Sequence, residues 1–163
     1  MSETLTETLP VLDRRLNAYR PDLADLRLKG QVTAERFVEG TLSRVTAAST
    51  AIRRVPRPDG VIDSEALQGE VLRVFEETME GWAFVQLETD RYVGYVAADA
   101  LGPLDPLPTH RVTALRTFVY PEADLRKPPL GALSFGAKLA LGDVAVTRGT
   151  PYLLLANGAG ALA

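Results

Sequence analysis

Hydrophobic residues in most of this chain occur in short runs, which either alternate with polar residues or are fully apolar. Pro, Gly and acidic residues separate these runs. Such a pattern predicts an all-β structure, because strands are short and the turns between them need residues of this kind. The predicted strands are Ser43–Thr46, Ala51–Arg54, Glu70–Glu76, Ala83–Glu88, Tyr92–Ala97, Arg111–Ala114, Thr117–Tyr120, Lys138–Leu141, Tyr152–Ala156 and Gly160–Ala163.

The segment before the first predicted strand has a different pattern. Residues 1–9 are polar and acidic, which is typical of a frayed tail. Asp13 is suited to cap a short helix, which should end before Pro21. Residues 22–40 mix apolar and charged side chains, and we expect them to wrap across the first β-unit. Residues 1–42 are therefore predicted to form a leader segment with one short helix.

An internal repeat organises the rest of the chain. The sequence Arg-Val-Thr-Ala occurs at 44–47 and again 67 residues later. The same offset aligns Gly69 with Gly136, Leu72 with Leu139, Val74 with Leu141, and Val85 with Tyr152. The repeat predicts two related β-units, at 43–102 and 110–163, joined by a proline-rich linker at 103–109. The second unit stops at its last strand, so we expect a truncated unit with an open edge.

Composition limits the classes of function. A hydrophobic content of 46% and a net charge of −3 fit globular domains and give no sign of disorder or of a nucleic-acid surface. Arginine pairs at 14–15 and 53–54 are interpreted as exposed, solvated charge. No apolar run is long enough to span a bilayer, and the start of the chain lacks the features of a signal peptide. A cytoplasmic location is therefore predicted.

The sequence contains no Cys and a single His, His110. Without Cys, this chain has no disulfide, no Cys-ligated zinc site and no thiol nucleophile. His110 lies in a proline-rich stretch and no Gly-x-Ser-x-Gly motif accompanies it, which favours an exposed residue over a catalytic base. We expect no catalytic residue, no cofactor and no metal site in this chain.

Motifs of the first unit follow one another in an order that resembles the bacterial SH3 (SH3b) domain. They are Arg53-Arg54-Val55-Pro56, Ala66-Leu67-Gln68-Gly69-Glu70, Gly81-Trp82-Ala83, Tyr92-Val93-Gly94-Tyr95-Val96 and Leu101. The second unit keeps Gly136 and Gly160 but lacks the Trp. The resemblance implies a mainly β fold, with two small SH3-like (SH3b) barrels in tandem after the short helical leader.

Leader and β-units together resemble the front part of cysteine peptidases of the NlpC/p60 family, of the dipeptidyl-peptidase VI or γ-D-glutamyl-L-diamino acid endopeptidase type. This family hydrolyses γ-D-glutamyl–diamino acid bonds in murein peptides with a Cys nucleophile and a His base. Neither has a counterpart in this chain, so we expect it to be inactive alone and its catalytic domain to lie in cis beyond this sequence. The resemblance implies a role in substrate gating and in positioning the peptidase.

By motif position, the resemblance assigns Asp63 and Tyr92 to recognition of the free amine of the substrate's N-terminal L-Ala. A carboxylate pairs with an ammonium group, and a phenol adds a hydrogen bond and an apolar wall. Trp82 is the third substrate-binding candidate, as an aromatic residue of a peptide groove. Each residue also has a structural interpretation: Asp63 as a turn residue, and Tyr92 and Trp82 as packing against the barrel.

Two other functions stay open. A stand-alone tandem SH3b module would bind peptidoglycan or a peptide ligand without any peptidase, and a stand-alone enzyme would have to use His110 or carboxylates. The expected partners are the catalytic domain, a murein peptide with a free N-terminal L-Ala, and a second copy of the chain paired through the open edge strand. Nucleic acid and membrane are not expected partners.

Overall fold

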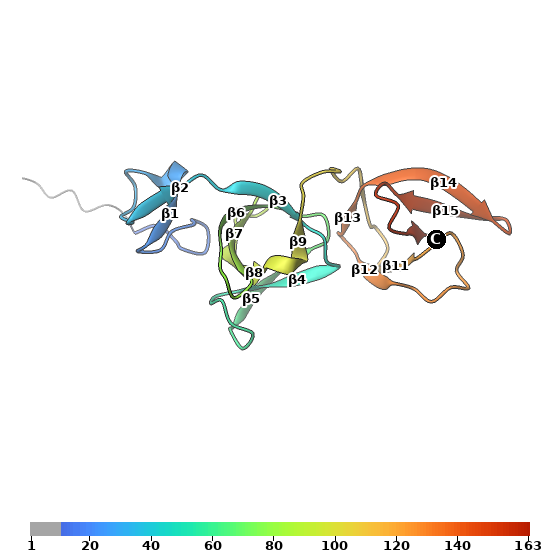
Figure 1. Ribbon diagram of the computed structural model, residues 1–163, viewed down its shortest axis with the longest axis horizontal. Helices are drawn as coiled ribbons and strands as arrows, with labels where there is room; N and C mark the ends of the chain where they lie inside the picture. The colour runs from blue at the N-terminus through green and yellow to red at the C-terminus, as the bar shows by residue number, and fades with distance from the viewer. Residues whose placement is uncertain (1–10) are drawn as a thin grey trace, which may run out of the picture.

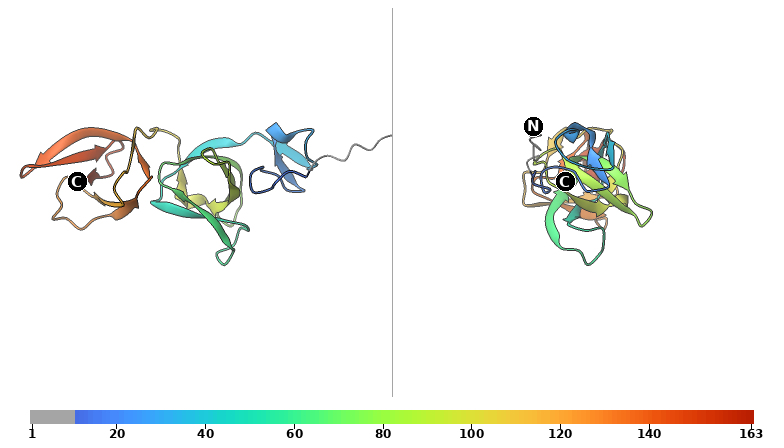
Figure 2. Two further views of the ribbon diagram at one scale, coloured as in Figure 1. Left: turned by 180° about the vertical axis from the view of Figure 1, so that it is seen from behind. Right: turned by 90° about the vertical axis from the view of Figure 1, so that its left-hand side faces the viewer.

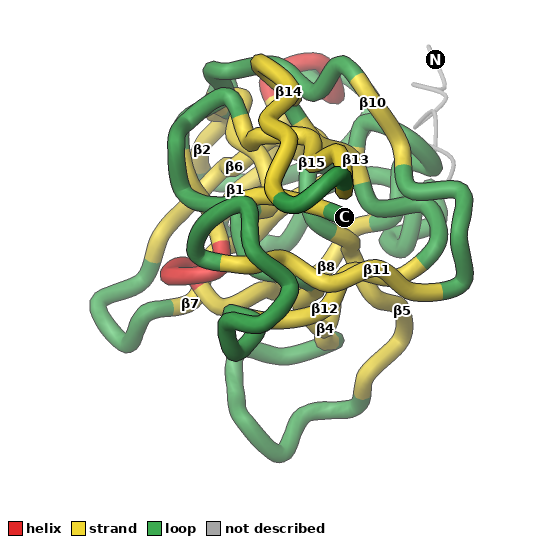
Figure 3. The backbone as a smooth tube through the Cα atoms, turned by 90° about the vertical axis from the view of Figure 1, so that its right-hand side faces the viewer, coloured by secondary structure: helices red, strands yellow, loops and turns green. Residues whose placement is uncertain are grey.

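Three parts of the protein lie in a row in the computed structural model, which describes residues 11–163 (Figures 1 and 2). They are the leader, a seven-stranded sheet and a five-stranded sheet. Helical structure is limited to two short turns in this range, η1 (Leu26–Leu28) and η2 (Ala98–Ala100), as Figure 3 shows. The predicted mainly β fold class is thus confirmed, whereas the tail at 1–9 lies outside the described residues. Within the described range, no helix has the length and apolar character needed to cross a membrane.

The leader contains a two-stranded parallel sheet and no α-helix. Its strands are β1 (Leu23–Asp25) and β2 (Arg36–Val38). The helix predicted after Asp13 is wrong, because Asp13 forms only a turn in which its carboxylate accepts a hydrogen bond from the Arg15 N–H (2.9 Å). The chain then reverses, and Tyr19 forms a β-bridge with Ala24. In this bridge the backbone groups of Tyr19 pair with Ala24, so they are not available for the hydrogen bonds of a helix.

The first sheet has seven strands in the order β5-β4-β8-β7-β6-β3-β9. They are β3 (Thr41–Val45), β4 (Ser49–Arg53), β5 (Ile62–Leu67), β6 (Val71–Glu77), β7 (Trp82–Leu87), β8 (Val93–Ala97) and β9 (Leu101–Gly102). The sheet curls around its core (Figure 1), but its outer strands β5 and β9 do not pair with each other in the described chain. The core consists of Val45, Ile52, Ala66, Leu72, Ala83, Val85, Leu87 and Val96.

The second sheet has the order β12-β11-β16-β15-β14, beside the separate pair β10–β13. The strands are β10 (His110–Arg111), β11 (Arg116–Tyr120), β12 (Gly131–Ser134), β13 (Lys138–Leu139), β14 (Leu141–Thr147), β15 (Thr150–Leu155) and β16 (Ala161–Leu162). The last strand, β16, lies between β11 and β15, because Leu162 pairs with both Val119 and Leu153. The expected open edge at the last strand is therefore wrong. The edge strands of this sheet are β12 and β14, and pairing with a second copy stays a prediction.

Corresponding positions of the repeat have the same local structure. Gly69 and Gly136 both have a positive φ, of 79° and 92°. The Gly69 N–H donates to the carbonyl oxygen of Val45 (2.8 Å), and the Gly136 N–H donates to that of Val112 (3.0 Å). Both valines are buried. Glycine is needed in the two turns because L side chains are strained at these φ values.

The two turns also pack against each other and join the units. The Lys138 N–H donates to the carbonyl oxygen of Gln68 (2.7 Å). A Cβ placed on Gly69 would lie 2.2 Å from the carbonyl oxygen of Lys138, and one on Gly136 would lie 3.3 Å from a methyl carbon of Leu67. Glycine is thus required at position 69 for two reasons: the positive φ of the turn, and the close approach of Lys138 from the second unit.

Candidate functional site

Asp63 lies where the pairing of β4 with β5 is irregular. Ile52 pairs with Ser64 and Arg53 pairs with Ile62, which leaves Asp63 as the extra residue of a β-bulge. A bulge changes the direction of the side chain relative to a regular strand. The Asp63 side chain is 14% exposed. Its interpretation as a turn residue is wrong, since it is a largely buried carboxylate within β5.

Arg54, directly after β4, binds this carboxylate at two points. Its Nη2 lies 2.6 Å from Oδ1 of Asp63, and its Nε lies 3.1 Å from Oδ2. The hydrogen bond to Asp63, and then the charge of Asp63, raise the pKa of Arg54. The Arg54 side chain is 66% exposed. Since ion pairs with an exposed member are weak, this arginine is an exchangeable partner for Asp63.

A pocket of about 340 Å³ opens beside this ion pair, where the leader meets the first sheet. The side chains that decide its chemistry are Arg14, Arg15, Tyr19 and Arg20 from the leader, and Arg54 and Asp63 from the sheet. Neither part of the chain forms the pocket alone. Its chemistry therefore depends on how the leader is fixed to the sheet.

Gln86 of β7 anchors the leader. This side chain is only 1% exposed. Its Nε2 donates to the carbonyl oxygen of Leu16 (2.8 Å), and its Oε1 accepts from the guanidinium of Arg27 (3.1 Å). On the neighbouring strand, the N–H of Val93 donates to the carbonyl oxygen of Arg15 (2.8 Å). A buried amide with satisfied partners fixes the leader turn in one position.

Arg20 forms a second tie between leader and sheet. Its guanidinium carbon lies 4.8 Å from the centre of the Phe84 ring. It donates to the carboxylates of Asp22 (2.7 Å) and Glu76 (2.6 Å) and to the hydroxyl of Tyr95 (3.1 Å). The hydrogen bond to Asp22 is the main cause that raises the pKa of Arg20 far above its ordinary value, and Glu76 and Tyr95 add to it. The charge of Arg20 is thus compensated by two carboxylates, and its side chain has a structural role in the pocket wall.

Tyr92 directly precedes β8 and is not among the residues that line this pocket. The pKa of Arg15 is raised mainly by hydrogen bonds to Asp13, and Tyr92 and Asp63 both add to the shift. Tyr92 also contributes to the raised pKa of Arg54. In addition, half-buried Tyr92 packs against the core of the sheet. The structure therefore supports the interpretation of Tyr92 as a packing residue, and its role in substrate binding stays a prediction.

Trp82 is not brought to this pocket. It begins β7 and pairs with Ala97, whereas Gln86, at the end next to the leader, pairs with Val93. Four residues of strand separate the two pairs by about 13 Å. Of the three predicted site residues, only Asp63 lines the pocket, and half-buried Trp82 lies towards the other end of β7.

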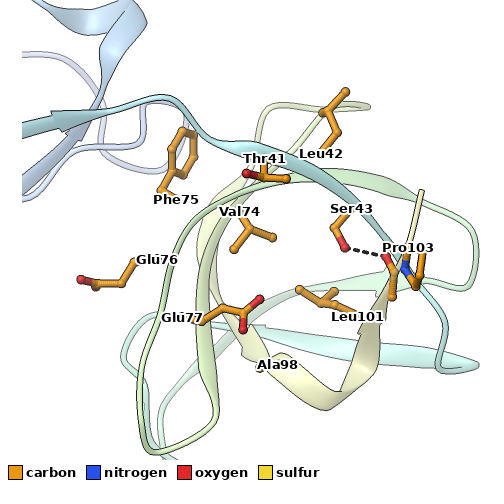
Figure 4. A pocket seen from close by; sticks show the side chains of 11 residues that line it. Thr41, Leu42, Ser43, Val74, Phe75, Glu76, Glu77, Ala98, Leu101 and Pro103 are labelled. Atoms are coloured by element: carbon orange, nitrogen blue, oxygen red, sulfur yellow. Dashed lines mark hydrogen bonds between the residues drawn. The ribbon is translucent and has the colours of Figure 1, made fainter. Parts of the chain in front are cut away.

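A larger and more open pocket of about 670 Å³ lies between β3, β6 and β9 (Figure 4). Its lining includes the apolar side chains of Val74 and Leu101 and the exposed carboxylate of Glu77. The Ser43 hydroxyl donates to the carbonyl oxygen of Gly102 (2.6 Å), so it is already engaged. None of the three predicted site residues lines this pocket.

The pocket arginines are the residues that sequence reasoning missed. Arg14, Arg15 and Arg54 are exposed, as the composition suggests, but all three line one pocket. The only signal in the sequence is the density of arginines around Tyr19 in the leader. That signal becomes informative only when the fold brings the leader against the bulge at Asp63.

Residues 52–101 match the family described as the bacterial dipeptidyl-peptidase Sh3 domain. This segment is a bacterial SH3 (SH3b) domain. The match begins within β4, ends at the first residue of β9 and includes Asp63, Trp82 and Tyr92. The leader, which supplies the other wall of the pocket beside the SH3b domain, lies outside the match. A comparison with curated proteins found no match.

Proposed function

We propose that this chain gates and positions the substrate of a murein-peptide cysteine peptidase of the NlpC/p60 family, whose catalytic domain acts in cis. The match of the SH3b domain to the dipeptidyl-peptidase type supports this role. The observation that carries it is the largely buried carboxylate of Asp63 on the wall of a pocket that the leader and the SH3b domain form together. The leader and the second unit, in this proposal, complete the tandem SH3b arrangement.

The chemistry of gating is an exchange of cations on Asp63. An N-terminal amine has a pKa of about 8, so it is mostly protonated at neutral pH. Without ligand, Arg54 compensates the carboxylate of Asp63. With ligand, the ammonium of L-Ala takes this position and Tyr92 adds a hydrogen bond. An acylated amine carries no charge, so it cannot replace Arg54, and peptides with a blocked amine are excluded.

Titration calorimetry with two small ligands tests amine recognition in this chain. The ligands are L-Ala-γ-D-Glu and its N-acetyl form, and the variants are Asp63→Asn and Tyr92→Phe. We expect the free amine to bind roughly tenfold more tightly in the parent protein, since a charge-assisted pair is worth about 1.5–3 kcal/mol. Asp63→Asn should remove this ratio and Tyr92→Phe should reduce it.

Asp99→Asn is the matched control, because Asp99 is exposed in η2 and lies outside the pocket. The ratio should not change in this variant. Amine recognition by the pocket is excluded if Asp63→Asn keeps the preference for the free amine.

The gating role itself is tested with the catalytic domain attached. Asp63→Ala and Tyr92→Phe should lower the ratio of kcat/KM for free-amine over N-acylated murein peptides more than they lower the bond-breaking step. An unchanged ratio contradicts gating. A reading frame that continues into a domain with Cys and His residues supports the proposal as well.

The larger pocket favours a second candidate function, the binding of a peptidoglycan fragment or peptide by a stand-alone tandem SH3b module. Its walls include the exposed side chain of Leu42 and the carboxylate of Glu77. Titration with murein fragments separates the two candidates. Binding that is lost in Leu42→Lys and kept in Asp63→Asn supports this second function, and the reverse supports gating.

A further inference from the structure

Arg14 differs from the other three arginines of the pocket, because it forms no ion pair within residues 11–163. The ion pairs of the others are Arg15 with Asp13, Arg20 with Asp22 and Glu76, and Arg54 with Asp63. The guanidinium carbon of Arg14 lies 5.0 Å from the centre of the Tyr19 ring. Its donors are therefore available to a ligand in the pocket.

The Tyr19 ring gives Arg14 a defined position. The hydroxyl of Tyr19 donates to the carbonyl oxygen of Leu12 (2.6 Å), and its backbone bridges to Ala24. The half-buried ring is thus held at both ends. A guanidinium stacked over a fixed aromatic ring loses less freedom when it binds a ligand than a free side chain does.

We propose that Arg14 binds a carboxylate of the ligand whose amine pairs with Asp63, so that the pocket selects peptides with both a free amine and a free carboxylate. This inference rests on the proposed function, because it takes Asp63 as the amine site. In a γ-linked L-Ala-D-Glu peptide, the group in question is the α-carboxylate of D-Glu. Arg14 then determines specificity on the leader side of the pocket.

The charges of the pocket support this selection. When an ammonium group takes the carboxylate of Asp63, Arg54 is released. The pocket then holds two guanidinium groups without an acid, Arg54 and Arg14. A ligand that brings only an amine leaves both uncompensated, whereas a carboxylate pairs with the planar fork of a guanidinium.

Amidation of the ligand provides the test. Calorimetry compares L-Ala-γ-D-Glu with its α-amide, in which the carboxylate is neutral and the amine unchanged. We expect amidation to weaken binding about three- to tenfold in the parent protein, as for a charge-assisted pair partly open to water. In Arg14→Gln both ligands should bind with similar affinity, and Arg14→Lys should keep part of the ratio.

Arg116→Gln is the control, because Arg116 is an exposed arginine on β11, away from the pocket. It should keep the full amidation ratio. An unchanged ratio in Arg14→Gln overturns the inference. Where Arg14→Gln abolishes all binding, Arg14→Lys decides: a retained amidation ratio supports a carboxylate site, and a loss of binding there too overturns it.

The two proposals fail in different ways. If acetylation of the amine has no effect that depends on Asp63, the proposed function fails. If amine recognition depends on Asp63 while Arg14→Gln leaves the amidation ratio unchanged, only the carboxylate site fails.

Discussion

Arg54 and Asp63 form a two-point ion pair across the bulge of β5, and its two members differ in their contact with water. The side chain of Asp63 is 14% exposed and that of Arg54 is 66% exposed. The less exposed carboxylate is stabilised by a cation, and the more exposed arginine can leave at little cost. This asymmetry is what makes the pair suitable for exchange with a charged ligand.

Removal of Arg54 should have opposite effects on folding and on binding. Arg54→Gln leaves the Asp63 carboxylate without its cation, and we expect a small loss in the free energy of unfolding, because the pair has an exposed member. Affinity for a free-amine ligand should rise several-fold, because the ammonium no longer displaces an arginine. Urea unfolding and calorimetry measure the two effects. Arg57→Gln, which disrupts the exposed pair with Asp59, should change neither; weaker ligand binding in Arg54→Gln argues against exchange.

Substitution of Gly69 should separate the two units. In Gly69→Ala, a Cβ at φ 79° would meet the Lys138 carbonyl oxygen at 2.2 Å. We expect a cost of about 3 kcal/mol or more and a larger radius of gyration in solution scattering. Gly81→Ala has a similar φ of 84° and no atom within 4 Å of the new Cβ, so it should cost only about 1 kcal/mol. Equal costs for the two variants would show that the contact between the units adds nothing.

Loss of the Gln86 amide should release the leader. Gln86→Leu removes the hydrogen bonds to Leu16 and Arg27 from a site that is 1% exposed. We expect a cost of about 2–4 kcal/mol, because the backbone carbonyl oxygen and the guanidinium both lose a partner. Hydrogen exchange should accelerate at the N–H of Val93, which donates to the leader. Gln31→Leu, an exposed control within the leader, should leave this exchange rate unchanged.

The second unit should lose stability in acid through Asp124. Hydrogen bonds from Arg148 (3.0 Å to each carboxylate oxygen) are the main cause that holds the pKa of Asp124 well below its usual 3.8. A depressed pKa in the folded state means that the stabilisation is complete above about pH 3.8 and is lost as the pH falls towards the lower, folded-state value.

The melting temperature should therefore fall less between about pH 6 and about pH 3 in Asp124→Asn than in the parent protein. Asp143→Asn, at an exposed position of β14, serves as the control and should keep the parent's pH dependence. A pH dependence that is the same in Asp124→Asn and in the parent would contradict the role of this ion pair.

Alternation and turn residues predict most of the SH3b strands, but some elements have no such signal. β7 and β8 have buried, apolar positions, so their pattern is clear. β5 is absent from the predicted strands because Ile-Asp-Ser-Glu at 62–65 looks polar, and its pairing partner rather than its composition makes it a strand. The helix expected after Asp13 fails for a related reason, since a long-range fit to Gln86 and Val93 decides the leader's conformation.

The candidate site also has one part that local sequence predicts and another that depends on long-range contacts. Motif position alone singles out Asp63, which lines the pocket, and Tyr92, which does not. Three of the four pocket arginines, Arg14, Arg15 and Arg20, come from the leader, some fifty residues from Asp63 along the chain. These arginines line one pocket only because the leader packs against the SH3b domain.

The backbone contact between Gln68 and Lys138 has a mechanical consequence. The SH3b domain and the second sheet are thus joined twice: by the proline-rich connection at 103–109 and by the main-chain contact between the two glycine turns. Because the joint is made of main-chain groups, it does not depend on the side chains of Gln68 and Lys138.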